Sequence, residues 1–180
     1  MLLSDIIGAQ VKECWFVGAL HHAASRSVNR SVLLQVNRFL QSARLTRFAA
    51  TALRVALAAG FLSAVADRFG LWGMPGTPGV AWGDWSHFLN YTGRLNWFLP
   101  SSLIPMVGAV ATLAETALAL LLLLDAWPRY TALASGALLL LFALTMTFAL
   151  GIKAPLGYSV YVGATAAFYL AATAALPQQT

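Results

Sequence analysis

The stretch VATLAETALALLLLL, residues Val110–Leu124, decides the fold of this 180-residue chain. It has one charged side chain, Glu115, and two threonines among twelve aliphatic residues. A helix of ~20 apolar residues crosses the ~30 Å hydrocarbon core of a bilayer. Extended back to Ser102, the stretch is long enough to do so. It therefore predicts a transmembrane helix that carries a carboxylate inside it.

The composition of the whole chain agrees with a membrane location. Hydrophobic residues make up 59% of the chain and charged residues 9%, whereas a soluble domain has roughly a quarter charged residues. The mean hydropathy is +0.73. This number of charged groups is too small to cover the surface of a globular protein in water. The sequence therefore predicts an all-α integral membrane protein whose main partner is the lipid bilayer.

Four segments are long and apolar enough to be transmembrane helices: residues 48–66, 102–124, 130–150 and 157–176. The third contains no charged residue. Small residues are frequent in all four, as close helix packing in lipid favours. The sequence thus predicts a membrane-spanning four-helix bundle over residues 46–176, preceded by a cytoplasmic or interfacial segment over residues 1–45.

Basic residues are distributed unevenly around these segments. One side of the membrane would carry Arg38, Arg44, Arg47 and Arg129, and the other Arg68, Arg94 and Lys153. Lysine and arginine favour the cytoplasmic side, and acidic residues count for little. We expect both termini on the cytoplasmic side of a bacterial inner membrane.

The formal charge of +5 and the pI near 9.9 would raise nucleic acid as a partner in a soluble protein. Here the positive residues follow the membrane flanks and form no compact patch, so no nucleic acid partner is expected. The single cysteine, Cys14, cannot form an intrachain disulfide. Nothing near His21 and His22 supplies further metal ligands, so we expect a surface pair and no metal site.

The N-terminal segment predicts a basic amphipathic helix over residues 27–45. Its apolar positions recur at helical spacing, and its basic and amide side chains fall on another face. Such a helix suits the surface of anionic lipids. A soluble helix or a disordered leader is the alternative. The first long apolar run begins only near residue 48, after Asp5 and Glu13, so no cleaved signal peptide is expected.

The loop between the first two spans is rich in glycine, proline and aromatic residues. Its GMPGTPG stretch, residues 73–79, is turn-forming, because proline fixes φ and glycine permits positive φ. Helical spacing of large residues then predicts a short helix over about 82–92.

The aromatic residues of this loop have two interpretations. They are Trp72, Trp82, Trp85, Tyr91 and Trp97. Indole and phenol groups favour the membrane interface, so they predict an aromatic belt. Alternatively, the loop is a lid over the outer mouth of the bundle that offers Asp84, His87 and Arg94 to a ligand.

Two charges lie inside the predicted spans. Glu115 lies ten residues before Asp125, at the expected cytoplasmic end of the second span, hence ~15 Å deep at 1.5 Å per residue. Arg54 lies seven residues past Arg47, hence ~10 Å from the same face. Charges in a bilayer face inward and pair. The sequence therefore predicts a buried Arg54–Glu115 ion pair.

This pair has a structural and a functional interpretation. As buried polar groups, the two residues would fix the register of their helices. Alternatively, Glu115 is a protonatable group on a proton, ion or quinone pathway, with Thr112 and Thr116 as neighbouring hydroxyls. The sequence leaves both interpretations open.

Several short motifs resemble the DoxX-like family of small four-helix membrane proteins. They are Leu53-Arg54, the stretch ADRFG at 66–70, Trp72-Gly73, Leu113-Ala114-Glu115 and GIKAPLGYSV at 151–160. The resemblance covers about residues 46–176. It implies a four-helix bundle and, for some members, association with membrane oxidoreductases acting on thiosulfate or quinols. It carries over Arg54 and Glu115 as the intramembrane charges, and no catalytic residue.

Three functions follow as expectations. The first is an accessory subunit that binds a quinone-like or other small apolar ligand, or a partner oxidoreductase; it would not be an autonomous enzyme, since no cysteine pair or haem-ligand pair lies in the spans. The second is a small proton-linked transporter that uses Glu115. The third is a structural or assembly protein. A homo-oligomer is compatible with each of them.

Overall fold

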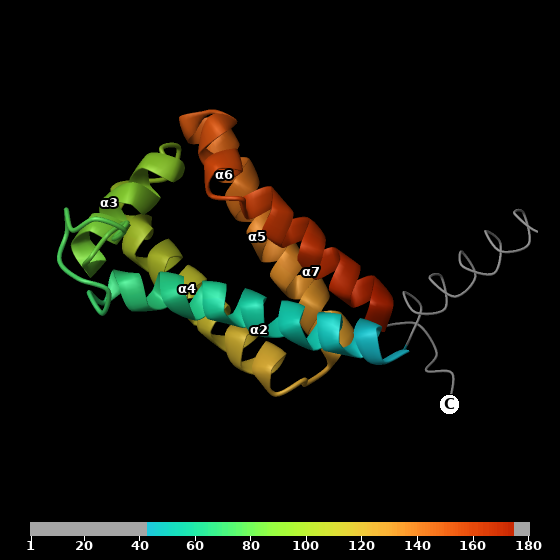
Figure 1. Cartoon of the computed structure of the whole chain (residues 1–180). Coiled ribbons are helices and arrows are strands. Elements are labelled where there is room, and N and C mark those ends of the chain that lie inside the picture. Colours follow the sequence, from blue (N-terminus) through green and yellow to red (C-terminus); the bar gives the residue numbers. More distant parts are fainter. Residues whose placement is uncertain (1–42, 175–180) are drawn as a thin grey trace, which may run out of the picture. The chain divides into compact units, whose positions relative to one another are not determined.

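The computed structural model describes residues 43–174, and every regular element in that range is a helix (Figure 1). The chain divides into two compact units, Met1–Phe48 and Ala49–Thr180. The account below concerns the described part of the second unit, together with the helix that leads into it. The predicted amphipathic helix over 27–45, except its last three residues, lies outside the described residues, as do Cys14, His21 and His22.

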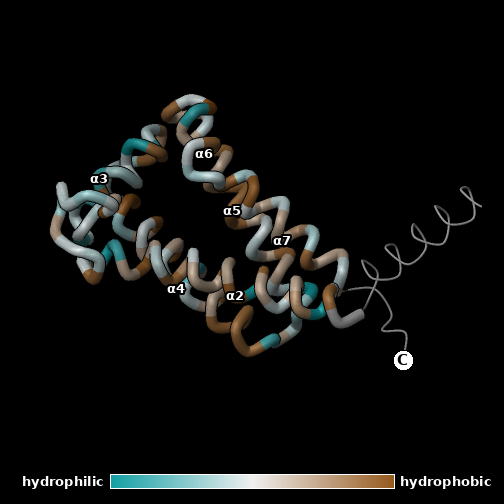
Figure 2. Tube along the Cα trace, viewed as in Figure 1, coloured by the Kyte–Doolittle hydropathy of each residue, from teal (hydrophilic) through white to brown (hydrophobic). Residues whose placement is uncertain are grey.

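Within residues 43–174, three helices are long and apolar enough to cross a membrane, which is the pattern of an integral membrane protein. They are α2 (Ala43–Arg68), α4 (Ile104–Leu123) and α5 (Pro128–Leu150). A single 3₁₀ turn, η1 (Ser101–Leu103), leads into α4. Hydrophobic residues dominate α4 and α5 in Figure 2. The first three predicted spans are thus confirmed as helices, the first one extending further at both ends.

Turn residues mark the ends of the long helices. Pro105 lies in the first turn of α4 and Pro128 in that of α5, where the missing amide hydrogen costs no helical bond. Between these helices Asp125 and Trp127 adopt φ of 52° and 44°, which makes the reversal tight. Helix α5 ends at Gly151, whose φ of 86° a residue with a side chain rarely adopts.

The last apolar segment is broken near its start. It forms the short helix α6 (Lys153–Gly157) and then α7 (Val160–Ala174), separated by Ser159 with a φ of 56°. The predicted helix from residue 157 therefore begins at Val160. At 1.5 Å per residue, the 15 described residues of α7 extend ~22 Å. This length is shorter than that of α2, α4 or α5.

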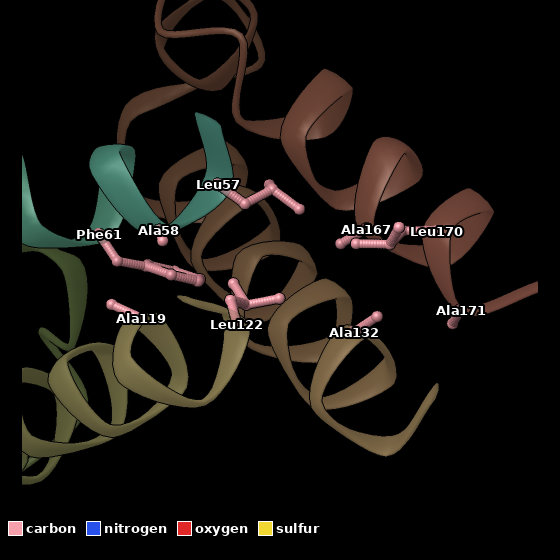
Figure 3. Close-up of a cluster of buried hydrophobic side chains, with 9 residues drawn as sticks. All are labelled: Leu57, Ala58, Phe61, Ala119, Leu122, Ala132, Ala167, Leu170 and Ala171. Carbon is pink, nitrogen blue, oxygen red and sulfur yellow. The ribbon is translucent and has the colours of Figure 1, made fainter. Parts of the chain in front are cut away.

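Four helices contribute to one core cluster, shown in Figure 3. Its members are Leu57, Ala58 and Phe61 of α2; Ala119 and Leu122 of α4; Ala132 of α5; and Ala167, Leu170 and Ala171 of α7. Most are small, which lets the helices approach closely. At Gly136 of α5 an added Cβ would lie 2.7 Å from the ring of Phe168 on α7. This close packing joins the last helix to the bundle.

The predicted short helix of the loop is α3 (Trp85–Leu95), which begins three residues later than expected. The reason is Asp84, whose carboxylate caps the helix by accepting the backbone N–H of His87. Helix α3 packs on the first half of α4. An added Cβ at Gly108 of α4 would lie 2.8 Å from Leu89 and 3.1 Å from Phe88 of α3, so a larger residue there would displace these side chains.

Candidate functional site

The charges of α2, of α4 and of the turn that follows α4 form two ion pairs, and neither is the predicted one. Glu115 Oε2 lies 2.5 Å from Nη1 of Arg68. Arg54 pairs instead with Asp125 of the turn, through Nη1 and Oδ1. The prediction of an Arg54–Glu115 pair is therefore wrong, although both residues are ion-paired.

The positions of the four charges along the helices, and the extension of α2 to Arg68, explain why the partners differ from the predicted ones. Arg54 and Arg68 are fourteen residues apart, or ~21 Å, and Glu115 and Asp125 are ten apart, or ~15 Å. Side chains of a helix tilt toward its N-terminus, so Glu115 leans along α4 toward the end where Arg68 lies. The predicted first span ends at residue 66, which leaves Arg68 in the outer loop. In the structure α2 continues to Arg68.

The two ion pairs differ in burial. The side chains of Arg68 and Glu115 are both 3% exposed, whereas those of Arg54 and Asp125 are 19% and 56% exposed. A pair near water is screened and contributes little. A buried pair has lost its hydration, so removing one partner strands a charge in the protein. Arg68 and Glu115 therefore form the chemically exceptional pair.

Arg68 has further contacts on α4 and α3. Its Nη1 donates to Thr112 Oγ1 at 2.7 Å, and that hydroxyl donates to the carbonyl of Gly108 at 2.8 Å. Its guanidinium carbon lies 4.1 Å from the centroid of the Phe88 ring and 5.4 Å from that of Trp82, which are cation–π distances. Its buried Nε has no hydrogen-bond partner among the described residues.

The residue before Arg68 organises the loop. Asp67 is 6% exposed, and its carboxylate accepts the backbone N–H groups of Ala81, Trp82 and Gly83 at 2.9, 3.2 and 3.3 Å. Hydrogen bonds to an ionised acceptor are the stronger kind. Asp67 therefore fixes the backbone of Trp82, whose ring in turn lies beside Arg68.

Two glycines allow the loop to fold tightly onto itself. Gly70 and Gly83 both have a φ of +73°. A Cβ at Gly70 would lie 2.8 Å from the carbonyl oxygen of Gly83, and one at Gly83 would overlap the backbone at Pro75. The segment Gly70–Gly83, which we name the cover loop, thus has its two ends against each other. Trp72 Nε1 also donates to the carbonyl of Ser63 on α2, at 3.0 Å.

The three residues expected to meet a ligand lie on or next to α3. Asp84 caps the helix, and Nδ1 of His87 lies 2.9 and 3.0 Å from its two carboxylate oxygens. The backbone N–H of His87 holds the pKa of Asp84 below its usual value. Arg94 is exposed on the last turn. In the described part of the chain, none of the three forms a hydrogen bond, ion pair or ring contact with Arg68 or Glu115, and the prediction of ligand contacts stays a prediction.

Sequence reasoning missed Asp67, Arg68 and Phe88 as parts of the site. The signal that could have found the arginine is the apolar pattern of α2, which continues to Val65, so that one more turn includes Arg68. Phe88 is one of the large residues whose helical spacing predicts the short loop helix, and that spacing does not place it beside an arginine. No sequence pattern marks a carboxylate that binds backbone amides far along the chain.

Chemically, this arrangement offers a cation with an unused donor, a carboxylate beside it and two aromatic rings. Among residues 43–174, no group of three or more histidine, cysteine, aspartate or glutamate residues could hold a metal ion. Comparisons of the chain with known protein families, with curated proteins and with solved structures give no match. The inference of function therefore depends on this site and on the composition of the chain.

Proposed function

We propose that this chain is a DoxX-like integral membrane protein that binds a small quinone-like ligand beside Arg68 and serves as an accessory subunit of a membrane oxidoreductase. The observation that carries the proposal is the buried Nε of Arg68, a donor with no hydrogen-bond partner among the described residues; the Nε of Arg54 is also without one, but within residues 43–174 only the guanidinium of Arg68 lies over aromatic rings. A buried donor of this kind is costly unless an acceptor reaches it. A ligand carbonyl is an acceptor of the required kind.

The surroundings of that donor favour a flat, apolar ligand. Phe88 is 5% exposed and its ring lies against the guanidinium. Ligand sites are mostly apolar, with a few polar groups that fix orientation. A ring with a carbonyl group would place one face against Phe88 and its oxygen toward Arg68. Glu115, beside the same guanidinium, would keep the empty site electrically neutral.

An accessory role agrees with the residues that the chain provides. It has a single cysteine and three histidines among its 180 residues. Electrons would therefore pass between the bound ligand and a partner protein that holds its own redox centre. In this proposal the chain supplies binding and orientation, and the partner supplies the redox chemistry.

The finer architecture belongs to the same proposal. We propose that α6 and α7 together make the fourth crossing, since α7 is apolar and shares the core cluster with the three long helices. Both termini would then lie on one side, the cytoplasmic face of a bacterial inner membrane. The cover loop and α3 would lie at the opposite face, with their tryptophans near the headgroups.

Affinity purification in a mild detergent, with mass spectrometry of both proteins and lipids, tests this proposal. We expect a quinone or a redox subunit to co-purify with the wild-type chain. Arg68→Gln should lose the quinone. Arg54→Gln, which breaks the partly exposed ion pair with Asp125, should retain it. A wild-type chain isolated without ligand or partner as a homo-oligomer would count against the proposal.

A proton-linked transporter is the second candidate, and the position of Glu115 favours it. A carboxylate that is 2% exposed within a helix able to span a membrane is a common feature of proton pathways. In proteoliposomes, a transporter would show pH-dependent flux that disappears in Glu115→Gln. Flux that survives this substitution would exclude the second candidate.

A further inference from the structure

We infer that the cover loop is a lid over Arg68 and that Asp67 is the latch that holds it closed. This inference rests on the proposed function, because it describes how a ligand would reach the same site. It assigns a role to Asp67, which touches neither Glu115 nor Thr112 in any recorded contact and is a positioning residue.

The need for a lid follows from the burial of Arg68. Its side chain is 3% exposed and its Nε is buried. Phe88 belongs to α3, which packs on α4, so its ring is part of a fixed wall. Trp82 lies before the cap of α3, on the cover loop itself, and is the ring that can leave without unfolding a helix. A ligand would therefore take the place of Trp82.

Apart from Trp82, whose ring centroid lies 5.3 Å from that of Phe88 and 5.8 Å from that of Tyr91, the cover loop is attached at few points and is mostly exposed. Its apolar side chains Leu71, Trp72 and Met74 are 77%, 60% and 78% exposed. An added Cβ at Gly76 or Gly79 would meet no atom within 4 Å. Beyond the tie of Trp72 to Ser63, the recorded side-chain hydrogen bonds that hold the loop to α2 are the three accepted by Asp67.

The loop is also built to move as one piece. Its ends at Gly70 and Gly83 are in close contact, and Pro75 lies against Gly83. Between Gly73 and Val80 its backbone hydrogen bonds, such as Val80 N–H to Thr77 O at 3.1 Å, are internal, whereas Gly70 and Leu71 donate to the carbonyls of Asp67 and Ala66 on α2. Releasing the three amides from Asp67 would thus lift Trp82 away from Arg68 while the loop keeps its shape.

Hydrogen–deuterium exchange in detergent tests the latch without any ligand. The amides of residues 81–83 should exchange slowly in the wild type and roughly tenfold faster or more in Asp67→Ala, because hydrogen bonds to a charged acceptor are lost. Asp67→Asn should give an intermediate rate, since its single amide oxygen cannot accept from all three donors. Asp125→Ala, which breaks the ion pair with Arg54, should leave these amides unchanged.

Stopped-flow binding of decyl-ubiquinone, read by quenching of tryptophan fluorescence, tests the lid. We expect Asp67→Ala to raise the association and dissociation rates together, roughly tenfold, with a smaller change in Kd. A merely structural role would lower the thermal midpoint and leave these rates unchanged. If Asp67→Ala is not recovered as a monodisperse protein, Asp67→Asn provides the same comparison with a smaller effect.

The outcomes separate the two proposals. Equal amide exchange in the wild type and in Asp67→Ala overturns the latch, and quinone rates that do not change while exchange accelerates overturn the lid. A wild-type protein that binds no quinone refutes the proposed function instead. In that case accelerated exchange in Asp67→Ala still supports the latch, and unaltered exchange refutes it.

Discussion

Replacing Arg68 with glutamine should destabilise the bundle far more than the same change at Arg54. Both are arginines of α2 paired with a carboxylate at the α4 side of the bundle. In Arg68→Gln the carboxylate of Glu115 stays behind, 3% exposed and without its cation. Breaking one side of a buried ion pair costs about 3 to 5 kcal/mol.

The matched change at the other pair should have a small effect. In Arg54→Gln the carboxylate left behind is Asp125, which is 56% exposed and can be hydrated. Exposed pairs contribute about 0 to 1 kcal/mol. The double variant Arg68→Gln/Glu115→Gln should recover most of the loss, because it removes both buried charges and leaves two neutral amides that can bond to each other.

Thermal unfolding of the purified variants in one detergent measures these differences. The expected loss for Arg68→Gln corresponds to a fall of roughly 10 °C in Tm, against a fall of about 2 °C or less for Arg54→Gln. The reasoning is refuted if the two single variants unfold at the same temperature. It is also refuted if the double variant loses the sum of the two single losses at Arg68 and Glu115.

Three further predictions concern the loop and its helix. Gly108→Ala should cost about 1 to 3 kcal/mol through overpacking against α3, seen as a lower Tm, whereas Gly60→Ala, where a Cβ meets nothing within 4 Å, should not destabilise. The cap at Asp84 should stabilise α3 above pH 3.8, the ordinary pKa of this group, and should be lost as the pH falls through the lower pKa of the folded state. Amide exchange at His87, measured relative to that of an unfolded chain at the same pH, should then accelerate. Gly83→Ala, at a φ of +73°, should accelerate exchange throughout the cover loop.

The elements of the fold could largely be predicted from the sequence, because long apolar runs have one stable solution in lipid. The ends were less certain. Helix α2 runs on to Arg68 because a charged residue at a helix end can still point its side chain into the protein. The break at Ser159 follows Pro155 and Gly157, which weaken a helix without fixing where it stops.

The site could be predicted only in part, because the pairing depends on where α2 ends. Counting residues predicted that Glu115 is ion-paired, as it is with Arg68. The count ended the first span at residue 66 and left Arg68 in the loop, so it selected Arg54. Counting residues could not predict the role of Asp67. Its carboxylate accepts from backbone amides fourteen to sixteen residues later in the chain, and the side chains of those residues take no part in the interaction.

The buried pair also constrains the order in which the protein is assembled in the membrane. Arg68 and Glu115 are 47 positions apart, so Arg68 is synthesised before its counter-ion. At the end of its helix, Arg68 can meanwhile extend to the lipid headgroups. Only when α4 arrives can the guanidinium turn inward. A ribosome-bound chain that stops before residue 115 should therefore hold α2 at the membrane with Arg68 still hydrated.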